Sequence, residues 1–380
     1  SVRGFHQRAV ALFGKFVQHK GIGGGTLTQS RLEGFVVGVQ RLAGTSHAIH
    51  LRLFQTGFQS VNSVQNFAVF LFSSGSGIGG GIIMGGRLQK GYGFAAGEIN
   101  RVKYEQVLGG GKGINVSVVL SRLGIPTKAI ALAAGFTGHE LERLVQAEGI
   151  ETEFVYLEHG TTRINVKLFA QEQFDVNAPG PEVSDKDIEA LFAVLDKLEE
   201  GDVLVLAGAV PGSCPEDIYE RILKRLDGRG IKFVVDTTGE GLLKVLPYKP
   251  FLIKPNHHEI SELFHDDVKS TDVDLIEKYA RKLQELGAVN VLVSRGSKGA
   301  TLVDETGAVN SEGIAKGNAI NNVGCGDSMV AGFVAGYETK HDYRYALKLG
   351  SAAGGASAFN DGLAPGEQIW EVYHNCFEET

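Results

Sequence analysis

Short, nearly continuous apolar runs alternate with amphipathic segments through the second part of the chain. The apolar runs predict buried parallel strands, because such strands are covered on both faces, and they lie at 203–206, 233–235, 251–253, 289–293 and 301–303. The amphipathic periods predict helices at about 185–198, 216–226 and 274–286, and glycines end two earlier helices predicted at 114–123 and 139–148. Ser184 and Asp187 have the spacing of a helix cap. This alternation predicts a doubly wound, mainly parallel α/β sheet with helices on both faces.

One segment has a different period. Residues 163–168 alternate polar and apolar side chains, as a strand exposed on one side does. Residues 101–104 alternate in the same way and could pair with it. We expect a small separate β lid, formed by segments at about 98–108 and 160–180, over the carboxyl ends of the main strands.

Residues 1–97 differ from the rest of the chain. They contain one acidic residue, Glu33, and no proline, and no apolar period persists. We expect an atypical Gly/Ser-rich extension here, spurious or disordered, followed by one α/β domain over 98–380. The pattern GxGxxG at 75–80 is typical of a dinucleotide site, but the residues after it are poor helix formers, so we do not assign it that function.

Composition narrows the class of function. The net charge of −7 disfavours nucleic acid and anionic membranes as partners. The apolar run 67–72 is too short to span a bilayer, so we expect a cytoplasmic protein. Its three cysteines, Cys214, Cys325 and Cys376, are too far apart to indicate a disulfide framework or a zinc site.

The strongest chemical motif is a glycine-rich turn that leads into a predicted helix at 329–337. Gly324, Cys325 and Gly326 precede Asp327, and free amides at a helix start bind anions. Asp327 could accept the proton of a hydroxyl group that attacks phosphorus. The alternative is that Asp327 only caps the helix.

A second glycine-rich loop at 109–113 also leads into a helix. Gly111 allows close approach of a ligand, Lys112 supplies a charge, and Asn115 can bond to a sugar hydroxyl. The spacing is not that of a Walker loop. Arg163, on the expected lid, could grip a phosphomonoester, or it could be a solvated surface residue.

Two further loops follow buried strands. In the first, Asn256 and Glu259 open a helix, and Glu259 could hold Mg²⁺ through water or simply favour the helix N-terminus. In the second, Ser294, Gly296 and Gly299 could admit a nucleotide or form a plain turn to the next strand.

From about Glu98 onward the chain resembles the phosphofructokinase B family of the ribokinase superfamily. The run 110–117 is similar to the first family signature, and 323–333 is similar to the second. The pair Asn256 and Glu259 resembles the NxxE element of the superfamily, and residues 162–165 resemble its lid strand. Within the family, the sequence of 254–259 is most similar to bacterial 1-phosphofructokinases.

The resemblance implies a ribokinase-like fold and transfer of the ATP γ-phosphate to a ketose phosphate, most simply fructose 1-phosphate, giving fructose 1,6-bisphosphate. It implies Asp327 as the base and the backbone of Gly324, Cys325 and Gly326 as the anion hole. The remaining roles that it implies are sugar-phosphate contacts from Gly111, Lys112, Asn115 and Arg163, organisation of Mg²⁺ and the nucleotide phosphates by Asn256 and Glu259, and a nucleotide site lined by Ser294, Gly296, Gly299 and Asn360. It also implies a homodimer formed through the lid.

Two departures from the family pattern stand out. Cys325 replaces the usual alanine, and we expect it to make the site sensitive to thiol reagents. The family's Asn-Pro-x-x-Asp segment is missing, since the first proline is Pro126 and the first aspartate is Asp175. We therefore expect a misread frame or a fusion at the start, a lost sheet strand and an exposed sheet edge. Tagatose-6-phosphate kinase, fructose-6-phosphate kinase and a non-catalytic nucleotide- or sugar-phosphate-binding protein remain as alternatives.

Overall fold

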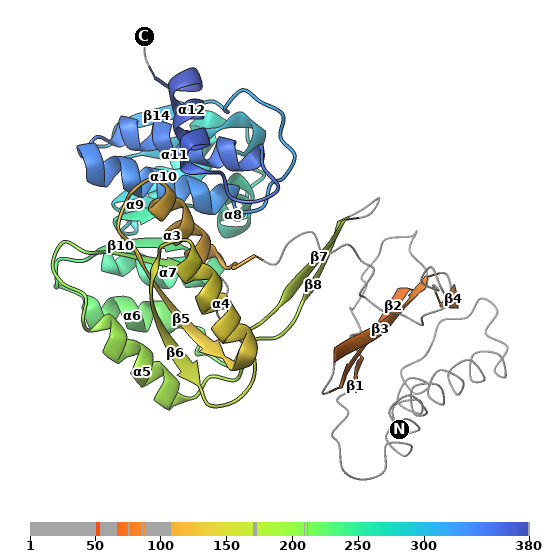
Figure 1. Cartoon of the computed structure of the whole chain (residues 1–380). Helices are drawn as coiled ribbons and strands as arrows, with labels where there is room; N and C mark the ends of the chain where they lie inside the picture. Colours follow the sequence, from red (N-terminus) through yellow and green to blue (C-terminus); the bar gives the residue numbers. More distant parts are fainter. Residues whose placement is uncertain are drawn as a thin grey trace. The chain divides into compact units, whose positions relative to one another are not determined.

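The computed structural model describes four strands between residues 51 and 88 and the range 108–378, except for 170–172, 209 and 211. Within 108–378, side chains are described except for 166–177, 209 and 211. The chain divides into two compact units, Ser1–Val107 and Leu108–Thr380. Figure 1 colours the chain continuously along its sequence. The expected lid partner at 101–104 lies outside the described residues.

The described strands of the first unit form one antiparallel sheet, in the order β1 (Leu51–Leu53), β2 (Phe67–Ser74), β3 (Gly77–Met84) and β4 (Arg87–Leu88). The GxGxxG pattern falls at the link between β2 and β3 and runs into β3. A dinucleotide site would need a helix after these glycines. Residues 77–84 instead form strand β3.

The second unit is built on a six-stranded sheet in the order β14-β13-β12-β11-β10-β9. The strands from β9 to β12 are parallel, whereas β13 and β14 are antiparallel additions at one edge. The strands are β9 (Val203–Ala207), β10 (Lys232–Asp236), β11 (Leu252–Ile253), β12 (Asn290–Ser294), β13 (Ala300–Val303) and β14 (Val309–Glu312). The predicted mainly parallel sheet is confirmed.

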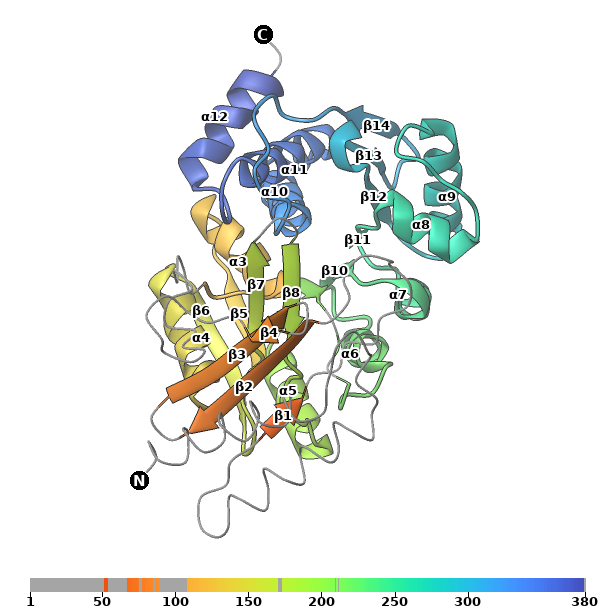
Figure 2. The same cartoon turned by 90° about the vertical axis from the view of Figure 1, so that its right-hand side faces the viewer.

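Helices cover both faces of this sheet, as the apolar strands require. Alternate residues of the strands enter two separate cores: Val235 and Ile253 pack on one side, and Val234 and Leu252 on the other. The first core is closed by α5 (Asp185–Leu195), α6 (Ile218–Leu226), α7 (Gly239–Val245) with its 3-10 turn η2 (Leu246–Tyr248), α8 (His257–Phe264) and α9 (Val273–Glu285). The second is closed by α3 (Lys112–Arg122), α10 (Cys325–Lys340), α11 (Tyr343–Ala358) and α12 (Gly366–Cys376), which gather at one end of this unit in Figure 2.

Glycines bring α10 and α11 into backbone contact. A Cβ atom on Gly332 would lie 2.6 Å from the Leu349 carbonyl oxygen, and one on Gly350 would lie 2.8 Å from the Met329 carbonyl oxygen. Such distances are shorter than any side chain tolerates. The separation of these two helices is therefore set by main-chain atoms.

Two smaller sheets complete the unit. Parallel strands β5 (Lys128–Ala134) and β6 (Glu151–Leu157) form one, with α4 (Gly135–Ala147) between them in sequence. Antiparallel strands β7 (Asn165–Phe169) and β8 (Gln173–Asn177) form the other, which projects from the helices of its unit in Figure 1. The predicted small separate sheet is confirmed, although its strand begins after Arg163. Among the described strands, β9 is an outer strand of the main sheet and β5–β6 stand apart from it.

The other local predictions differ from the structure by a few residues. The Ser184 cap is confirmed, because its hydroxyl accepts from the Asp187 amide and the Asp187 carboxylate accepts from the Ser184 amide. The helix that it starts ends at Leu195, three residues before the predicted end. No helix in the described part of the chain is long and apolar enough to cross a membrane.

Candidate active site

The candidate site lies where the parallel strands end. Strand β10 ends at Asp236, β11 is followed by Lys254, and β12 ends at Ser294. Parallel strands present their carboxyl ends at one edge of the sheet, which is where open α/β sheets bind ligands. Both glycine-rich loops contribute to this edge.

The turn before α10 is shaped for close approach to an anion. Gly324 is the residue before the helix, with φ 78°, and a Cβ atom there would lie 2.6 Å from Leu363 Cδ2. The positive φ favours glycine here, and a side chain at 324 would also have to displace Leu363. No side chain caps this helix, so its first amides point outward without a side-chain acceptor.

Asp327 lies in the first turn of α10 and is 7% exposed. Its carboxylate accepts a 2.7 Å hydrogen bond from Asn115 Nδ2, across 212 residues of sequence. Because no side chain caps α10, the interpretation of Asp327 as a simple helix cap is wrong. The two sequence motifs meet in one place.

Burial raises the pKa of Asp327 above its ordinary value, and the charge of Asp236 adds to this rise. The Asn115 hydrogen bond and the charges of Lys112 and Lys254 act in the opposite direction. A carboxylate with a raised pKa is a stronger base than a solvated one. The environment of Asp327 thus suits proton transfer.

A buried aspartate that the sequence analysis did not single out connects two lysines. Asp236 is 3% exposed, and its carboxylate lies 3.3 Å from Lys112 Nζ and 3.7 Å from Lys254 Nζ. Lys254 Nζ is also 3.3 Å from the position of a Cβ atom on Gly326. The positive charge of Lys254 therefore lies next to the glycine turn.

The sequence does carry a signal for these two residues. Asp236 and Lys254 each follow a buried apolar run, and a charged residue at the carboxyl end of a buried strand is a site candidate in α/β folds. A cavity of about 490 Å³ opens beside Lys112 and Asp236, also lined by Gly208, Cys214 and Thr237.

Asn256 and Glu259 form a reciprocal cap at the start of α8. The Asn256 side chain accepts from the Glu259 amide at 2.9 Å, and Glu259 Oε2 accepts from the Asn256 amide at 2.8 Å. One carboxylate oxygen of Glu259 therefore caps the helix start, as the alternative interpretation predicted, and its role toward Mg²⁺ stays a prediction. Asn256 also forms a parallel β-bridge with Ser294, so these two predicted nucleotide residues are neighbours.

Gly296 and Gly299 form a tight turn, as the alternative interpretation of this loop predicted. The turn contains a 3-10 segment, η3 (Gly296–Lys298), and joins β12 to β13 as an antiparallel pair. A Cβ atom on Gly299 would lie 2.0 Å from the Glu312 carbonyl oxygen. Packing alone thus requires glycine at 299.

Three more predicted residues lie in different surroundings. Asn360 Nδ2 donates to the Ala356 carbonyl at 2.8 Å and to Gln368 Oε1 at 2.9 Å, at the end of α11. Arg163 is exposed in the segment before β7. Burial raises the pKa of the Cys325 thiol, and the neighbouring charge of Asp327 adds to the rise. Less thiolate means lower reactivity, which opposes the expected sensitivity to thiol reagents.

A phosphotransferase needs a helix start that can hold an anion, a buried carboxylate beside it and nearby lysines, and this site has all three. The chain belongs to the pfkB family of carbohydrate kinases, whose model matches residues 81–369.

Similar proteins agree with this membership. The chain is 40% identical to a 1-phosphofructokinase of Bacillus subtilis over 279 residues, covering 73% of this chain and 91% of that protein. It is 33% identical to a D-tagatose-1-phosphate kinase of Bacillus licheniformis, covering 70% and 86%. The solved structure of phosphofructokinase-2 from Escherichia coli in complex with fructose-6-phosphate superposes with a TM-score of 0.65 at 27% identity, covering 71% and 88%.

Proposed function

We propose that this protein transfers the γ-phosphate of ATP to a ketose phosphate, with fructose 1-phosphate as the preferred acceptor and fructose 1,6-bisphosphate as the product. The observation that carries the proposal is the 2.7 Å contact between Asn115 and Asp327. It joins the two glycine-rich loops into one site, with an anion-binding turn on one side and a lysine on the other.

In this proposal Asp327 takes the proton of the attacking hydroxyl group. Asn115 fixes the carboxylate, and the amides of Gly324, Cys325 and Gly326 bind the phosphoryl oxygens while charge develops on them. Lys254, next to Gly326, adds positive charge to the same oxygens. Gly111, Lys112 and Arg163 hold the sugar phosphate, and Arg163 approaches from the lid segment.

The nucleotide takes the other side of the turn. Asn256, Ser294, Gly296, Gly299 and Asn360 line its site in this proposal. The β-bridge between Asn256 and Ser294 supports a continuous surface there.

The residues present fit Mg²⁺ as the companion of ATP. Magnesium keeps several waters and uses one or two protein carboxylates together with substrate phosphates. Within the described range, no cluster of three or more His, Cys, Asp or Glu could hold a metal by itself. Glu259 would hold the ion through water, and Asp236, whose Oδ1 is buried without a hydrogen-bond donor, would be a second oxygen donor at this edge. The ion would neutralise the negative charge of the phosphates.

A homodimer formed through the β7–β8 lid is also part of the proposal.

The test is an ADP-release assay with ATP, Mg²⁺ and a panel of four acceptors: fructose 1-phosphate, fructose 6-phosphate, tagatose 1-phosphate and tagatose 6-phosphate. We expect the highest kcat/KM with fructose 1-phosphate. A higher value with tagatose 1-phosphate would favour the activity named for the Bacillus licheniformis protein. ATP binding without turnover on any acceptor would refute the proposed catalysis and favour a binding protein.

A further inference from the structure

The loop between α11 and α12, residues 359–365, packs against the glycine-rich turn at 324–326, which precedes Asp327. Leu363 lies against Gly324, with Cδ2 2.6 Å from the position of a Cβ atom there. The Asp361 carbonyl accepts from Asn321 Nδ2 at 2.8 Å, just before the turn. The turn therefore depends on where this loop lies.

A second route joins the same loop to α10. The Ala364 amide donates to Ser357 Oγ at 3.2 Å, and Ser357 Oγ lies 2.8 Å from Ser328 Oγ. Both serines are buried, and Ser328 directly follows Asp327. A shift of Ala364 would thus be transmitted through Ser357 to Ser328, the residue next to the proposed base.

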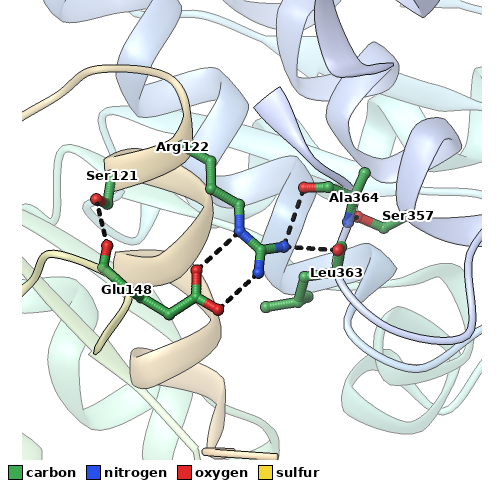
Figure 3. A network of polar contacts seen from close by, with 6 residues as sticks. All are labelled: Ser121, Arg122, Glu148, Ser357, Leu363 and Ala364. Atoms are coloured by element: carbon green, nitrogen blue, oxygen red, sulfur yellow. Dashed lines mark hydrogen bonds and ion pairs between the residues drawn. The ribbon is translucent and has the colours of Figure 1, made fainter. Parts of the chain in front are cut away.

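One side chain holds this loop from outside. Arg122, at the end of α3, donates from one terminal nitrogen to the Leu363 carbonyl at 2.6 Å and to the Ala364 carbonyl at 3.2 Å. Its other two nitrogens grip the Glu148 carboxylate at 3.0 and 2.8 Å. In Figure 3 the guanidinium lies between Glu148 and the backbone of Leu363 and Ala364.

Main-chain packing fixes the same junction. A Cβ atom on Gly366 would lie 2.0 Å from the Arg122 carbonyl oxygen, so the start of α12 touches the end of α3. Helix α3 also begins at Lys112 and carries Asn115. Helix α3 therefore carries Asn115, the hydrogen-bond partner of Asp327, near its N-terminus and Arg122, which holds the 359–365 loop, at its C-terminus.

We propose that Arg122 is a positioning residue for phosphoryl transfer, acting through Leu363 and Ala364 on the turn at Gly324 and Asp327. This proposal rests on the proposed function. A planar guanidinium can satisfy two carbonyls and a carboxylate in fixed directions, whereas a lysine ammonium cannot reproduce that geometry. The two carbonyl bonds, not the ion pair with Glu148, carry the effect.

The experiment compares Arg122→Lys with two control variants in the full chain. Arg225→Lys makes the same substitution at another bidentate arginine–carboxylate pair. Arg225, on α6, donates two hydrogen bonds of 2.8 and 2.7 Å to the Asp196 carboxylate. Glu148→Gln weakens the ion pair and leaves both carbonyls of the loop available to Arg122. The measurements are kcat, KM for ATP, KM for the sugar phosphate, and amide hydrogen exchange of segments 321–328 and 359–365.

For Arg122→Lys we expect kcat to fall about tenfold, because a displaced turn loses contacts that form only in the transition state. Both KM values should change less than about twofold, and exchange should become faster in both segments. The control variants should match the unsubstituted chain in kcat and in exchange. Measuring well below each thermal midpoint separates this effect from unfolding.

Three results would overturn the inference: unchanged exchange in both segments, an equal loss of kcat in Arg225→Lys, or the full effect in Glu148→Gln. If the unsubstituted chain turns over no ketose phosphate, the proposed function fails in its own assay. The exchange measurement then decides whether Arg122 holds the turn.

Discussion

Replacing Asp327 by asparagine removes the proposed base and keeps nearly the same shape. The side-chain oxygen of the new amide can still accept the 2.7 Å hydrogen bond from Asn115. General-base catalysis contributes about 10²- to 10⁴-fold, so kcat should fall within that range. The KM for ATP should change little, because the amides of the glycine turn remain in place.

The same substitution should raise stability at neutral pH. Burial raises the pKa of Asp327 above its ordinary value of 3.8, so between the unfolded and the folded pKa the folded state binds a proton that the unfolded state releases. The free energy of unfolding therefore falls as pH rises through that window, by about 1.4 kcal/mol per pH unit. An asparagine avoids this cost. Its advantage should be largest above the folded pKa, should shrink as pH falls through this window and should vanish below the unfolded pKa.

The assays are steady-state kinetics across pH and urea unfolding at pH 7. The unsubstituted enzyme should lose kcat/KM at acid pH as Asp327 takes up a proton, and Asp327→Asn should lack this limb. Asp304→Asn is a matched control, because Asp304 is 4% exposed and accepts from the Thr306 and Ala308 amides in the turn between β13 and β14. It should lose stability and keep kcat. A near-normal rate in Asp327→Asn, or an unchanged acid limb, would refute the assignment of the base.

Three other substitutions test the contacts around the site. Asn115→Ala should lower kcat about tenfold or more. The hydrogen bond from Asn115 lowers the pKa of Asp327, so its removal should raise that pKa and move the acid limb to higher pH; a pH–rate profile checks both effects. Asp236→Asn leaves two lysines without their shared carboxylate and should cost about 3 kcal/mol in urea unfolding, whereas Asp196→Asn, at an exposed fork, should leave the midpoint nearly unchanged. Gly299→Ala should cost about 3 kcal/mol or more, because its Cβ would meet a carbonyl oxygen at 2.0 Å, whereas Gly228→Ala, with φ 72° and open space, should cost about 1 kcal/mol; equal midpoints for the two glycine variants would contradict the packing argument.

The main sheet and its helices could be predicted from the sequence, because each signal is local. The apolar run 233–235 became the interior of β10, and Ser184 started α5 as its cap predicted. Helix ends were predicted less accurately, since α5 stops at Leu195 although the helical spacing of apolar positions continues to Leu198. Where a helix ends depends on how the chain packs beyond it.

The candidate site could be predicted in its parts and not in its connections. Asp327 and Asn115 each follow a glycine-rich turn, and such turns are visible in sequence. The salt-bridge geometry of Asp236 depends on α3, β10 and β11 meeting at one edge, which no local pattern specifies. The role of Arg122 is still less visible, because its partners lie 241 and 242 residues away and are backbone carbonyls.

The glycine seam between α10 and α11 has a consequence for how sugar preference can change. Since main-chain atoms touch at Gly332 and Gly350, the helix that carries Asp327 cannot move closer to its neighbour. Substitutions in the surrounding loops can alter which ketose fits while the carboxylate and the amides of the turn keep their spacing. Acceptor specificity and the phosphate-transferring geometry can therefore vary independently within this architecture.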